Sequence, residues 1–585
     1  MRKLLKLVEP CLLFKHDQAM EDPRDGLTLF GPLDQGKPYG IRAGVVGTKF
    51  GIPKFKAWVA WLQRPVRLQN PALARPPFPG FEAAFHVPWH SAPILTIEVD
   101  EDELKAKTGL DDRHQRVFQT VDLFSKAIID AIRDEESKPD VWFVVIPDYV
   151  RRYCRPEGIV APEDRHESQR FFKSAKQAKA LYQSPSLFSE ANDAAEPYFF
   201  KEHFRNQLKA RLLEHRAPTQ ILREGTLENI IFTPQNAREA GLIKMQSQIA
   251  WNVATTAFYK TGGRPWKVNG IRKGVCYIGL VYKKDQRSVD NRMACCGAQM
   301  FLDSGDGVVF KGAVGPWHDT TTRDFHLNRR AAHDLIEMAI KSYRERRPDK
   351  RPPDELFIHG KTTFNDDEWA GFREAAPSET SIVGVKIRDD SSLKLFRIGD
   401  TPVLRGTAFV RNPRNATLWT RGWTPRLGTY PGLEVPNPLS VEICRGQSSI
   451  ETVLNDIMAL TKLNYNACLF ADGSPITLKF ANAVGEVLTA GPHPSWRRAT
   501  AVHVLHLTNS ASKASWRELP ATVRQDCVRM KECLMESSTE PGGTHAIRKT
   551  KELSFDQQGR EAVAPPGVFN CLRSACQKRS SRSEP

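Results

Sequence analysis

The sequence has no long apolar run, no paired cysteine motif and no glycine-rich dinucleotide fingerprint. Its N-terminal segment, MRKLLKLVEPCLLF, is interrupted by Lys6 and Glu9, so it is too broken for a signal peptide and too short for a membrane span. The 11 cysteines are scattered without a CxxC, which is typical of proteins in a reducing cytoplasm. We therefore expect a cytoplasmic protein without membrane contact, and neither a structural zinc site nor a GxGxxG dinucleotide enzyme.

Acidic residues are outnumbered, because 84 Lys and Arg residues face 68 Asp and Glu residues and leave a formal net charge of +16. A basic surface that is simply solvated explains this excess. A partner that carries phosphates also explains it, since basic clefts recruit nucleic-acid backbones. The charge alone does not separate these two interpretations. A chain of 585 residues, 40% of them hydrophobic, is long enough for roughly two to four domains.

Strand-like and helix-like segments alternate in the first half of the chain. The segments 41–48 (IRAGVVGT) and 93–99 (PILTIEV) are typical of strands, and residues 121–133 repeat apolar side chains at helical spacing. The unbroken apolar run 141–146 (VWFVVI) indicates a strand that is buried on both faces of a parallel sheet. These segments predict a doubly wound α/β domain, which binds ligands at the carboxyl ends of its strands. The polar residues 155–200 are expected to form an irregular surface excursion.

A second α/β unit is expected to begin near residue 245. Its apolar patterns predict helices over 247–259 and 332–343, strands over 276–283 and 355–359, and a hairpin turn at 304–307. Helix starts are indicated by the pairs Asn365 with Glu368, Ser448 with Glu451, and Ser474 with Pro475. Beyond Ala490, the segments GPHPS, STEPGG and VAPPG predict a weakly ordered extension over 491–585.

Four polar residues form the strongest candidate site: Arg205, Lys209, Gln220 and Lys260. Arg205 and Lys209 are four residues apart, so they share one face of the expected basic helix EHFRNQLKARLLE. Gln220 lies in the strand-like segment 218–227, which is expected to enter a turn. Lys260 ends a helix just before two glycines that let the backbone approach a ligand closely. Such a group suits a terminal phosphate, which carries about −1.5 to −2 charges, although a solvated helix and an unrelated lysine explain the same spacing.

Several segments resemble Argonaute proteins, namely FYKTGGRPW, the PTQI segment after a basic helix, and LTKLNYNACLFADGSPITLKFANAVGEVL. In that family they belong to a MID domain and an RNase H-like PIWI domain. Other stretches are similar to the short prokaryotic Argonaute of the SPARTA type: DPRDGLTLFGP, GIRAGVVGTK, RPPFPGFEAAF, DVWFVVIPD, YCRP, GVCYIGLVYKK, ACCGAQMFLDSGDG and VPNPL. The lack of preceding N and PAZ domains points to the same type. The resemblance covers about residues 1–490.

The resemblance implies an α/β protein with a Rossmann-like MID domain over 1–240 and a catalytically inactive RNase H-like PIWI domain over 241–490. A divergent, poorly ordered tail would occupy 491–585. Relatives end soon after the EVL-type helix, close to the MID pocket, whereas this sequence continues. A lineage-specific extension and a shifted reading frame both explain the added residues, and the abrupt change in composition favours the second.

Arg205, Lys209, Gln220 and Lys260 fall, by this resemblance, where the family binds the 5′-phosphate of its guide. The resemblance also implies a Mg²⁺ ion at that phosphate, which in many relatives is held with the help of the C-terminal carboxylate. Arg205 replaces a tyrosine or histidine found in many relatives. A guanidinium binds phosphate but stacks on the first base only in part, so the family's first-base preference need not be kept.

Three positions of the expected PIWI domain lack carboxylates. Active relatives carry metal ligands in the first strand, after the histidine of a later strand, and in the final helix. By resemblance, these positions hold Leu280, Lys361 and Asn482 here. Leucine cannot bind a metal ion, lysine repels one and a neutral amide binds one poorly, so two-metal cleavage of a phosphodiester is not expected. Lys361 is an alternative contact for a duplex backbone, plain packing accounts for Leu280 and Asn482, and His359 is expected to be a satisfied interior histidine.

The resemblance therefore implies a catalytically inactive guide-binding subunit. Its expected partners are a guide RNA, a complementary single-stranded target DNA and a separate TIR-APAZ protein, with which relatives form a heterodimer and larger oligomers on activation. In relatives the TIR domain hydrolyses NAD in abortive antiviral defence, so we expect the enzymatic activity in the partner. The alternative hypothesis is an active guide-directed DNA or RNA endonuclease.

Overall fold

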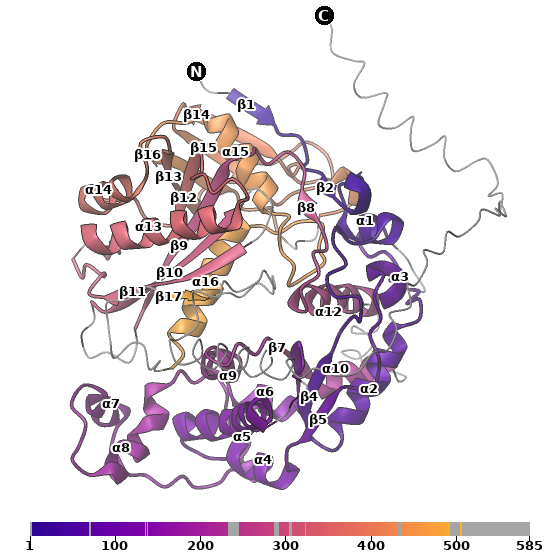
Figure 1. The fold of residues 1–585 in the computed structure, drawn as a ribbon, viewed down its shortest axis with the longest axis vertical. Coiled ribbons are helices and arrows are strands. Elements are labelled where there is room, and N and C mark those ends of the chain that lie inside the picture. The colour runs from indigo at the N-terminus through magenta and orange to yellow at the C-terminus, as the bar shows by residue number, and fades with distance from the viewer. Residues whose placement is uncertain are drawn as a thin grey trace, which may run out of the picture. The chain divides into compact units, whose positions relative to one another are not determined.

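The computed structural model describes residues 3–68, 72–134, 136, 138–231, 245–285, 290, 292–302, 307–321, 323–430, 432, 434–491 and 503–505. All of them belong to one compact unit, residues 1–511. Their strands form a four-stranded sheet, a ten-stranded sheet and a three-stranded sheet (Figure 1). Most of the extension predicted over 491–585 lies outside the described residues, as do residues 304–306 of the predicted hairpin turn.

The four-stranded sheet is parallel throughout, with the order β5-β4-β6-β7. Its strands are β4 (Ala43–Gly47), β5 (Leu95–Glu98), β6 (Val141–Ile146) and β7 (Thr219–Arg223). The main covering helices are α2 (Gly51–Leu62), α5 (Arg113–Asp134) and α9 (Phe204–Leu212). Phe143 of β6 packs with α2 on one face, and Trp142 packs with α5 and α9 on the other. This burial on both faces explains the unbroken apolar run and confirms the predicted doubly wound domain.

Short helices make up most of the other elements before residue 261. They are α1 (Pro23–Phe30), α3 (Phe81–Phe85), α4 (Glu101–Thr108), α6 (Asp148–Tyr153), α7 (Ala175–Gln183), α8 (Ser189–Ala195), α10 (Glu224–Ile231) and α12 (Gln246–Lys260), with 3-10 turns η1 (Lys15–Asp17), η2 (Pro162–Asp164) and η3 (Glu196–Phe199). The segment 155–200 is not irregular throughout, because Ser174 caps α7 by accepting a hydrogen bond from the Gln177 amide. The chain after β7 enters helix α10 directly, so the turn predicted there is wrong.

The ten-stranded sheet is built around β9 (Val275–Lys284). β9 pairs antiparallel with β10 (Ala294–Leu302) and parallel with β12 (Glu355–Gly360). β11 (Gly307–Gly315) and β13 (Ser381–Asp389) continue the sheet outward, which gives the order β11-β10-β9-β12-β13. This order places antiparallel strands on one side of β9 and parallel strands on the other, in a mixed α/β unit like the RNase H-like one that the resemblance implied.

The first residues of the chain contribute to the ten-stranded sheet rather than to the four-stranded one. β1 (Lys3–Lys6) pairs antiparallel with β14 (Thr407–Asn412), and β2 (Leu12–Leu13) pairs with β8 (Lys267–Val268) in the three-stranded sheet. The predicted boundary at residue 240 lies outside the described residues. The remaining strands are β3 (Ala19–Met20), β15 (Asn415–Trp419), β16 (Leu439–Arg445) and β17 (His503–Leu505).

Helices cover both faces of the ten-stranded sheet. Helices α13 (Arg329–Arg346) and α14 (Asp366–Ala375) lie on one face, and α15 (Ile450–Leu460) and α16 (Ile476–Leu488) lie on the other. A 3-10 turn, η4 (Pro425–Leu427), lies between β15 and β16 in the sequence. The close approach of α16 requires Gly279 of β9, where a Cβ would lie 2.2 Å from the Thr477 carbonyl oxygen. Asn365 caps α14 as predicted by accepting from the Glu368 amide, whereas the N-cap of α15 is Ser449, one residue after the predicted position.

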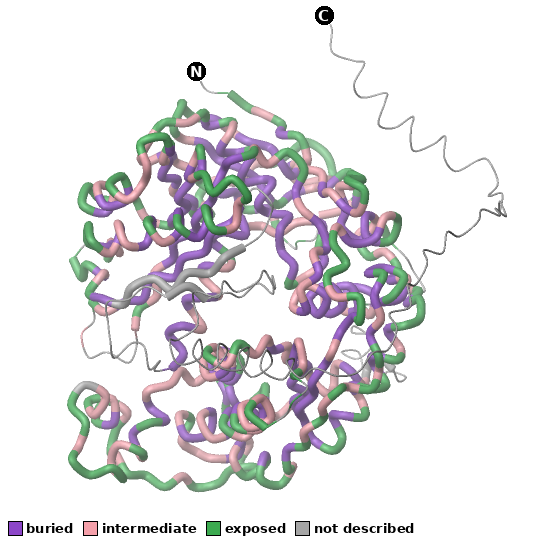
Figure 2. Tube along the Cα trace, viewed as in Figure 1, coloured by how far each residue is buried: buried purple, intermediate pink, exposed green. Residues whose placement is uncertain are grey.

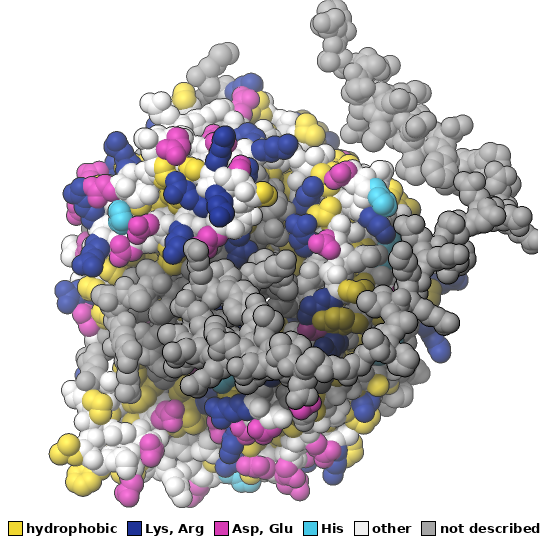
Figure 3. Space-filling view, in the orientation of Figure 1, with side chains coloured by type: hydrophobic (Ala, Val, Ile, Leu, Met, Phe, Trp, Pro, Cys, Tyr) yellow, Lys and Arg dark blue, Asp and Glu magenta, His cyan; other side chains and the backbone are white. Residues whose placement is uncertain are grey.

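Buried residues line both large sheets (Figure 2). None of the described helices is both long and apolar enough to cross a membrane. On the face shown in Figure 3, basic and acidic side chains of the described residues are interspersed, so the net charge of +16 does not form a single visible patch. A functional site therefore has to be identified from individual contacts.

Candidate phosphate-binding site and the positions of the metal ligands

Helix α9 presents Arg205 and Lys209 because its other side packs into the core. Phe204, Leu208 and Leu212 recur at every fourth position, and all three are buried against α5 and the four-stranded sheet. Arg205 and Lys209 each follow one of these residues, which places both cations on an adjacent side of the helix. Arg205 is exposed and Lys209 is half-buried. The shared helix face predicted for these two residues is therefore present.

Lys260 reaches β7 from the last turn of α12. Its ammonium donates hydrogen bonds to the Thr219 carbonyl oxygen at 2.8 Å and to the Gln220 side-chain oxygen at 2.7 Å. The helix ends at Lys260, and two residues later Gly262 has a φ of +101°, a conformation that favours glycine. Because the oxygen of Gln220 already accepts from Lys260, the NH₂ group of Gln220 is the part that remains to donate to a ligand.

The three cations lie close enough that the charge of Arg205 lowers the pKa of both lysines. Burial, followed by the charge of Arg205, lowers the pKa of Lys209 to about 8. Burial, followed by the charges of Lys209 and Arg205, lowers the pKa of Lys260 well below its usual value. No carboxylate among the described residues offsets these shifts or pairs with the three cations. With Gln220 they form a group that we call the phosphate set, and cations gathered without a counter-ion favour an anionic ligand.

The final helix α16 joins this region to the ten-stranded sheet through Glu486. The Glu486 carboxylate lies 3.1 Å from the Lys201 ammonium and 2.7 Å from the Lys283 ammonium. Burial opposes its ionisation, but the two lysines outweigh burial and lower the pKa of Glu486. Sequence reasoning missed these residues, because Lys201 and Glu486 are 285 positions apart and no local pattern connects them.

The phosphate set does not by itself fit the Mg²⁺ ion expected beside a guide phosphate. Magnesium prefers carboxylate and other oxygen ligands. The set supplies three cations, and its one side-chain oxygen, that of Gln220, already accepts a hydrogen bond from Lys260. An anion bound here would therefore be neutralised by side-chain cations.

Leu280 does not lie on the face of β9 that contacts α16. Its side chain packs in the cluster formed with α13 and α14, and only 1% of Leu280 is exposed. Its neighbour Val281 faces the other way and pairs with Gly297, where a Cβ would lie 3.0 Å from the Ala481 carbonyl oxygen of α16. Because strand side chains alternate between faces, the residue of β9 that faces α16 is Val281 and not the predicted Leu280.

Lys361 and Asn482 lie close to this end of β9. Gly360, the residue before Lys361, is the register partner of Leu280, and Lys361 itself is exposed. Asn482 is half-buried on α16. It directly follows Ala481, whose carbonyl oxygen approaches Gly297 of β10. Since Val281, Lys361 and Asn482 carry no carboxylate, these positions do not fit the divalent ions of a two-metal nuclease.

His359 is the buried histidine of β12, with 1% of its surface exposed. Its Nδ1 lies 3.0 Å from the Thr477 hydroxyl oxygen, and burial lowers its pKa to about 3. The neutral, hydrogen-bonded state agrees with the predicted interior histidine.

No protein-family model and no curated protein matches the sequence. The structure is similar to that of Clostridium butyricum Argonaute bound to a guide DNA with a 5′ deoxycytidine and a 19-mer target DNA, with a TM-score of 0.53, 14% identity, and coverage of 84% of this chain and 54% of that one. It is also similar to Drosophila Piwi, with a TM-score of 0.50, 13% identity and coverage of 83% and 54%. This chain thus spans about half the length of each. From these similarities, we conclude that the chain has an Argonaute-like fold.

Proposed function

We propose that this protein binds a 5′-phosphorylated guide RNA at the phosphate set and uses it to recognise complementary single-stranded DNA. One observation carries the proposal. Arg205, Lys209 and Lys260 lie together without an acidic partner among the described residues, beside the donor group of Gln220. The Argonaute-like fold supports the same proposal, since the Clostridium butyricum Argonaute was found with a guide and a target strand.

A terminal phosphate matches the phosphate set in charge and in hydrogen bonding. It carries about −1.5 to −2 charges near neutral pH, and its oxygens accept hydrogen bonds. Lys209 and Lys260 donate as compact ammonium groups, whereas the planar guanidinium of Arg205 donates in pairs. A bound dianion also raises the pKa of both lysines, so binding reverses the shifts that burial and mutual repulsion produce.

Sequence specificity in this proposal comes from base pairing, while the protein contacts the backbone of the paired strands. The duplex stays intact, because Val281, Lys361 and Asn482 provide no carboxylate for the metal ions that would cut it. The alternative function, a guide-directed DNA or RNA endonuclease, requires metal ligands that these three positions do not offer.

We further propose a separate TIR-APAZ protein as the partner, with NAD hydrolysis in that partner as the output of antiviral defence. The support is the resemblance of the sequence to short Argonautes of the SPARTA type. The two proteins should co-purify, and complementary single-stranded DNA should start NAD consumption by the guide-loaded complex. Scrambled DNA is the control. Failure to form a complex, or equal NAD loss with scrambled DNA, would contradict this assignment.

The chemistry of the guide's end tests the binding proposal. Full-length protein is titrated with labelled RNA and DNA of one sequence, each made with a 5′-phosphate or a 5′-hydroxyl, and binding is followed by fluorescence anisotropy. The 5′-phosphate should increase affinity at least about tenfold, because each charge-assisted hydrogen bond contributes about 1.5–3 kcal/mol. Equal affinity for the two ends refutes the proposed site, and tighter binding of DNA than of RNA refutes the choice of guide.

A further inference from the structure

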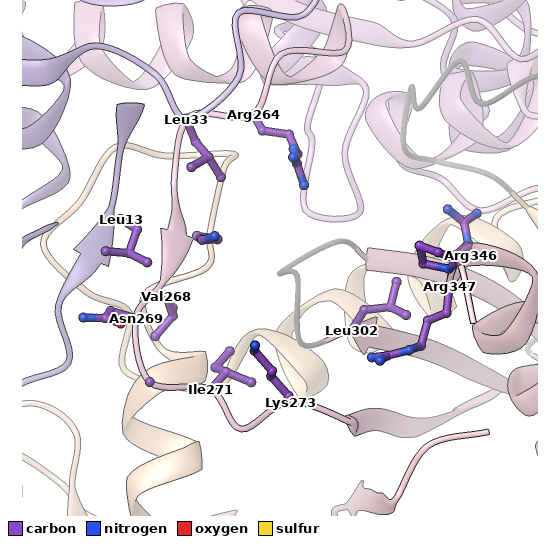
Figure 4. Close-up of a pocket in the computed structure, with 13 residues that line it drawn as sticks. Leu13, Leu33, Arg264, Val268, Asn269, Ile271, Lys273, Leu302, Arg346 and Arg347 are labelled. Carbon is purple, nitrogen blue, oxygen red and sulfur yellow. The ribbon is translucent and has the colours of Figure 1, made fainter. Parts of the chain in front are cut away.

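A cavity of about 740 Å³ lies in a different part of the chain from the phosphate set and from Val281, Lys361 and Asn482. Its walls come from the segment after α12, from β8 and the turn that follows it, from the end of β10 and from the end of α13 (Figure 4). Cavities of a few hundred to about 1,000 Å³ are the size that holds small ligands. None of the roles discussed above uses this space.

Five cations line the cavity: Arg264, Lys267, Lys273, Arg346 and Arg347. None of its described lining residues is acidic. The cations come from two separate segments, 264–273 and 346–347, and Figure 4 shows Arg264, Lys273 and Arg347 reaching toward the same space. The tertiary fold therefore brings a basic stretch of sequence, 264–273, next to the two arginines at the end of α13.

Carboxylates outside the cavity lie near two of these cations. The Arg264 Nε lies 3.7 Å from the Asp34 carboxylate, and the Lys267 ammonium lies 3.7 Å from the Asp17 carboxylate. The Asp17 side chain is 80% exposed, so solvent screens this pair. Exposed pairs at such distances contribute little to stability, so the charge of Lys267 remains available to a ligand.

The two arginines at the end of α13 have a structural explanation. Arg347 lies 3.2 Å from the Asp349 carboxylate and donates to the Tyr343 hydroxyl at 3.2 Å, and cations are favoured at a helix C-terminus. This explanation does not extend to Lys267 and Lys273, which lie outside the helices. Lys273 is exposed and forms no ion pair within the described part of the chain.

The cavity also has an apolar wall, to which Leu33, Val268 and Ile271 contribute. Gly270, in the turn after β8, has a φ of +88°, and no atom lies within 4 Å of the position that its Cβ would take. The turn therefore leaves space at the edge of the cavity. Cations beside an apolar surface suit a nucleotide, because its phosphate needs the cations and its base needs the apolar contact. We infer that this cavity binds a nucleotide through its phosphate.

The location separates this cavity from the degenerate metal positions. Leu302 lines the cavity and is the register partner of Cys276, near the start of β9. Val281 is five residues further along the same strand, a distance of roughly 17 Å at the usual rise per residue. A nucleotide here requires no guide at the phosphate set, so the inference stands independently of the proposed function. A free nucleotide and a nucleotide within a bound strand share this chemistry.

The experiment uses full-length protein, two probes and a matched control variant. The probes are ADP, titrated by calorimetry, and a single-stranded RNA with a 5′-hydroxyl, titrated by fluorescence anisotropy. The double variant Lys267→Ala/Lys273→Ala removes the two lysines of the cavity, of which Lys267 pairs only with the exposed Asp17 and Lys273 forms no ion pair among the described residues. Lys341→Ala is the control, because Lys341 is exposed on α13 and does not line the cavity. Lys273→Glu serves as a second variant, since this exposed position tolerates a charge change.

At least an about tenfold loss of ADP affinity in the double variant would assign a free nucleotide to the cavity. A loss confined to the RNA would assign a nucleotide within a strand. The inference is overturned if wild-type protein binds neither probe, if the variants bind both probes as the wild type does, or if Lys341→Ala loses as much. Preference for a 5′-phosphorylated guide is unaffected in every case, so failure here is distinguishable from failure of the proposed function.

Discussion

The phosphate set and the far end of β9 differ in whether their partly or fully buried side chains are basic or apolar. In the phosphate set, Lys209 and Lys260 are partly buried lysines, and burial and repulsion lower the pKa of both. At the far end of β9, Leu280 and Val281 are apolar and pack into the cores on opposite faces of the sheet. Partly buried charge without a counter-ion destabilises a fold, whereas apolar packing stabilises it. The difference indicates that the first region is built for a ligand and the second for packing.

The largest expected effect comes from removing the cations of the phosphate set. Lys209→Ala/Lys260→Ala should weaken binding of a 5′-phosphorylated guide by about 100-fold or more, because two charge-assisted contacts of about 1.5–3 kcal/mol each are lost. Fluorescence anisotropy measures this loss. Lys126→Ala, at an exposed position of α5, is the control. An equal loss with a 5′-hydroxyl guide would show that the two lysines do not recognise the phosphate.

Substitutions at the packed end of β9 should change the free energy of unfolding and not the affinity for a guide. Leu280→Ala should lower the free energy of unfolding by about 2–5 kcal/mol, because it opens a cavity in a core where 1% of the side chain is exposed. Asn482→Ala, at a half-buried position, should change it by less than about 1 kcal/mol. Urea unfolding measures both. A small loss of stability in Leu280→Ala would contradict the comparison, because packing would no longer account for the leucine at that position.

Guide affinity should depend on pH in the direction set by Lys209. Its pKa of about 8 in the free protein means that the lysine loses its proton as the pH rises above 8, and the affinity for a 5′-phosphate should then fall up to about tenfold per pH unit. Anisotropy titrations between pH 7 and pH 9.5 are the measurement, with buffers chosen at constant ionic strength. Lys209→Arg stays charged and should flatten the profile. A decline unchanged in that variant would assign the titration to another group.

The smallest effect concerns stability without a ligand. Lys209→Met should raise the free energy of unfolding near pH 7 by about 1–2 kcal/mol, because it replaces a poorly compensated charge with an apolar chain. The pKa of Lys209 is lowered in the folded state, so the wild type binds fewer protons when folded and regains stability between about pH 8 and pH 10.5. The advantage of the variant, followed by thermal unfolding, should shrink over that range. A less stable variant would indicate that the lysine supports the fold.

Local patterns were sufficient to predict much of the fold and of the phosphate set. The unbroken run of β6 indicated a strand buried on both faces, and the four-residue spacing of Arg205 and Lys209 indicated one helix face. Both depend on periodicity within a single element, which a sequence displays directly. The contact between Lys260 and Gln220 joins two elements, and only the resemblance to Argonautes brought these residues together before the structure did.

Other features depend on tertiary contacts that no local pattern records. Resemblance identified the strand carrying Leu280, but a shift of one residue turns a side chain to the other face, and only the approach of α16 shows that Val281 faces it. The pairing of β1 with β14 connects segments about 400 residues apart. The cations of the cavity likewise come from two segments, 264–273 and 346–347, which no local pattern connects.

The most direct test of the central claim is a single experiment that measures retention and cleavage of a target together. Protein loaded with a 5′-phosphorylated guide RNA receives end-labelled complementary single-stranded DNA with Mg²⁺ or Mn²⁺, and one sample is divided between a native gel and a denaturing gel. We predict that the native gel shows a slowly migrating complex and that the denaturing gel shows only full-length DNA. A product cut at a position set by the guide, or no retained target, would contradict the claim.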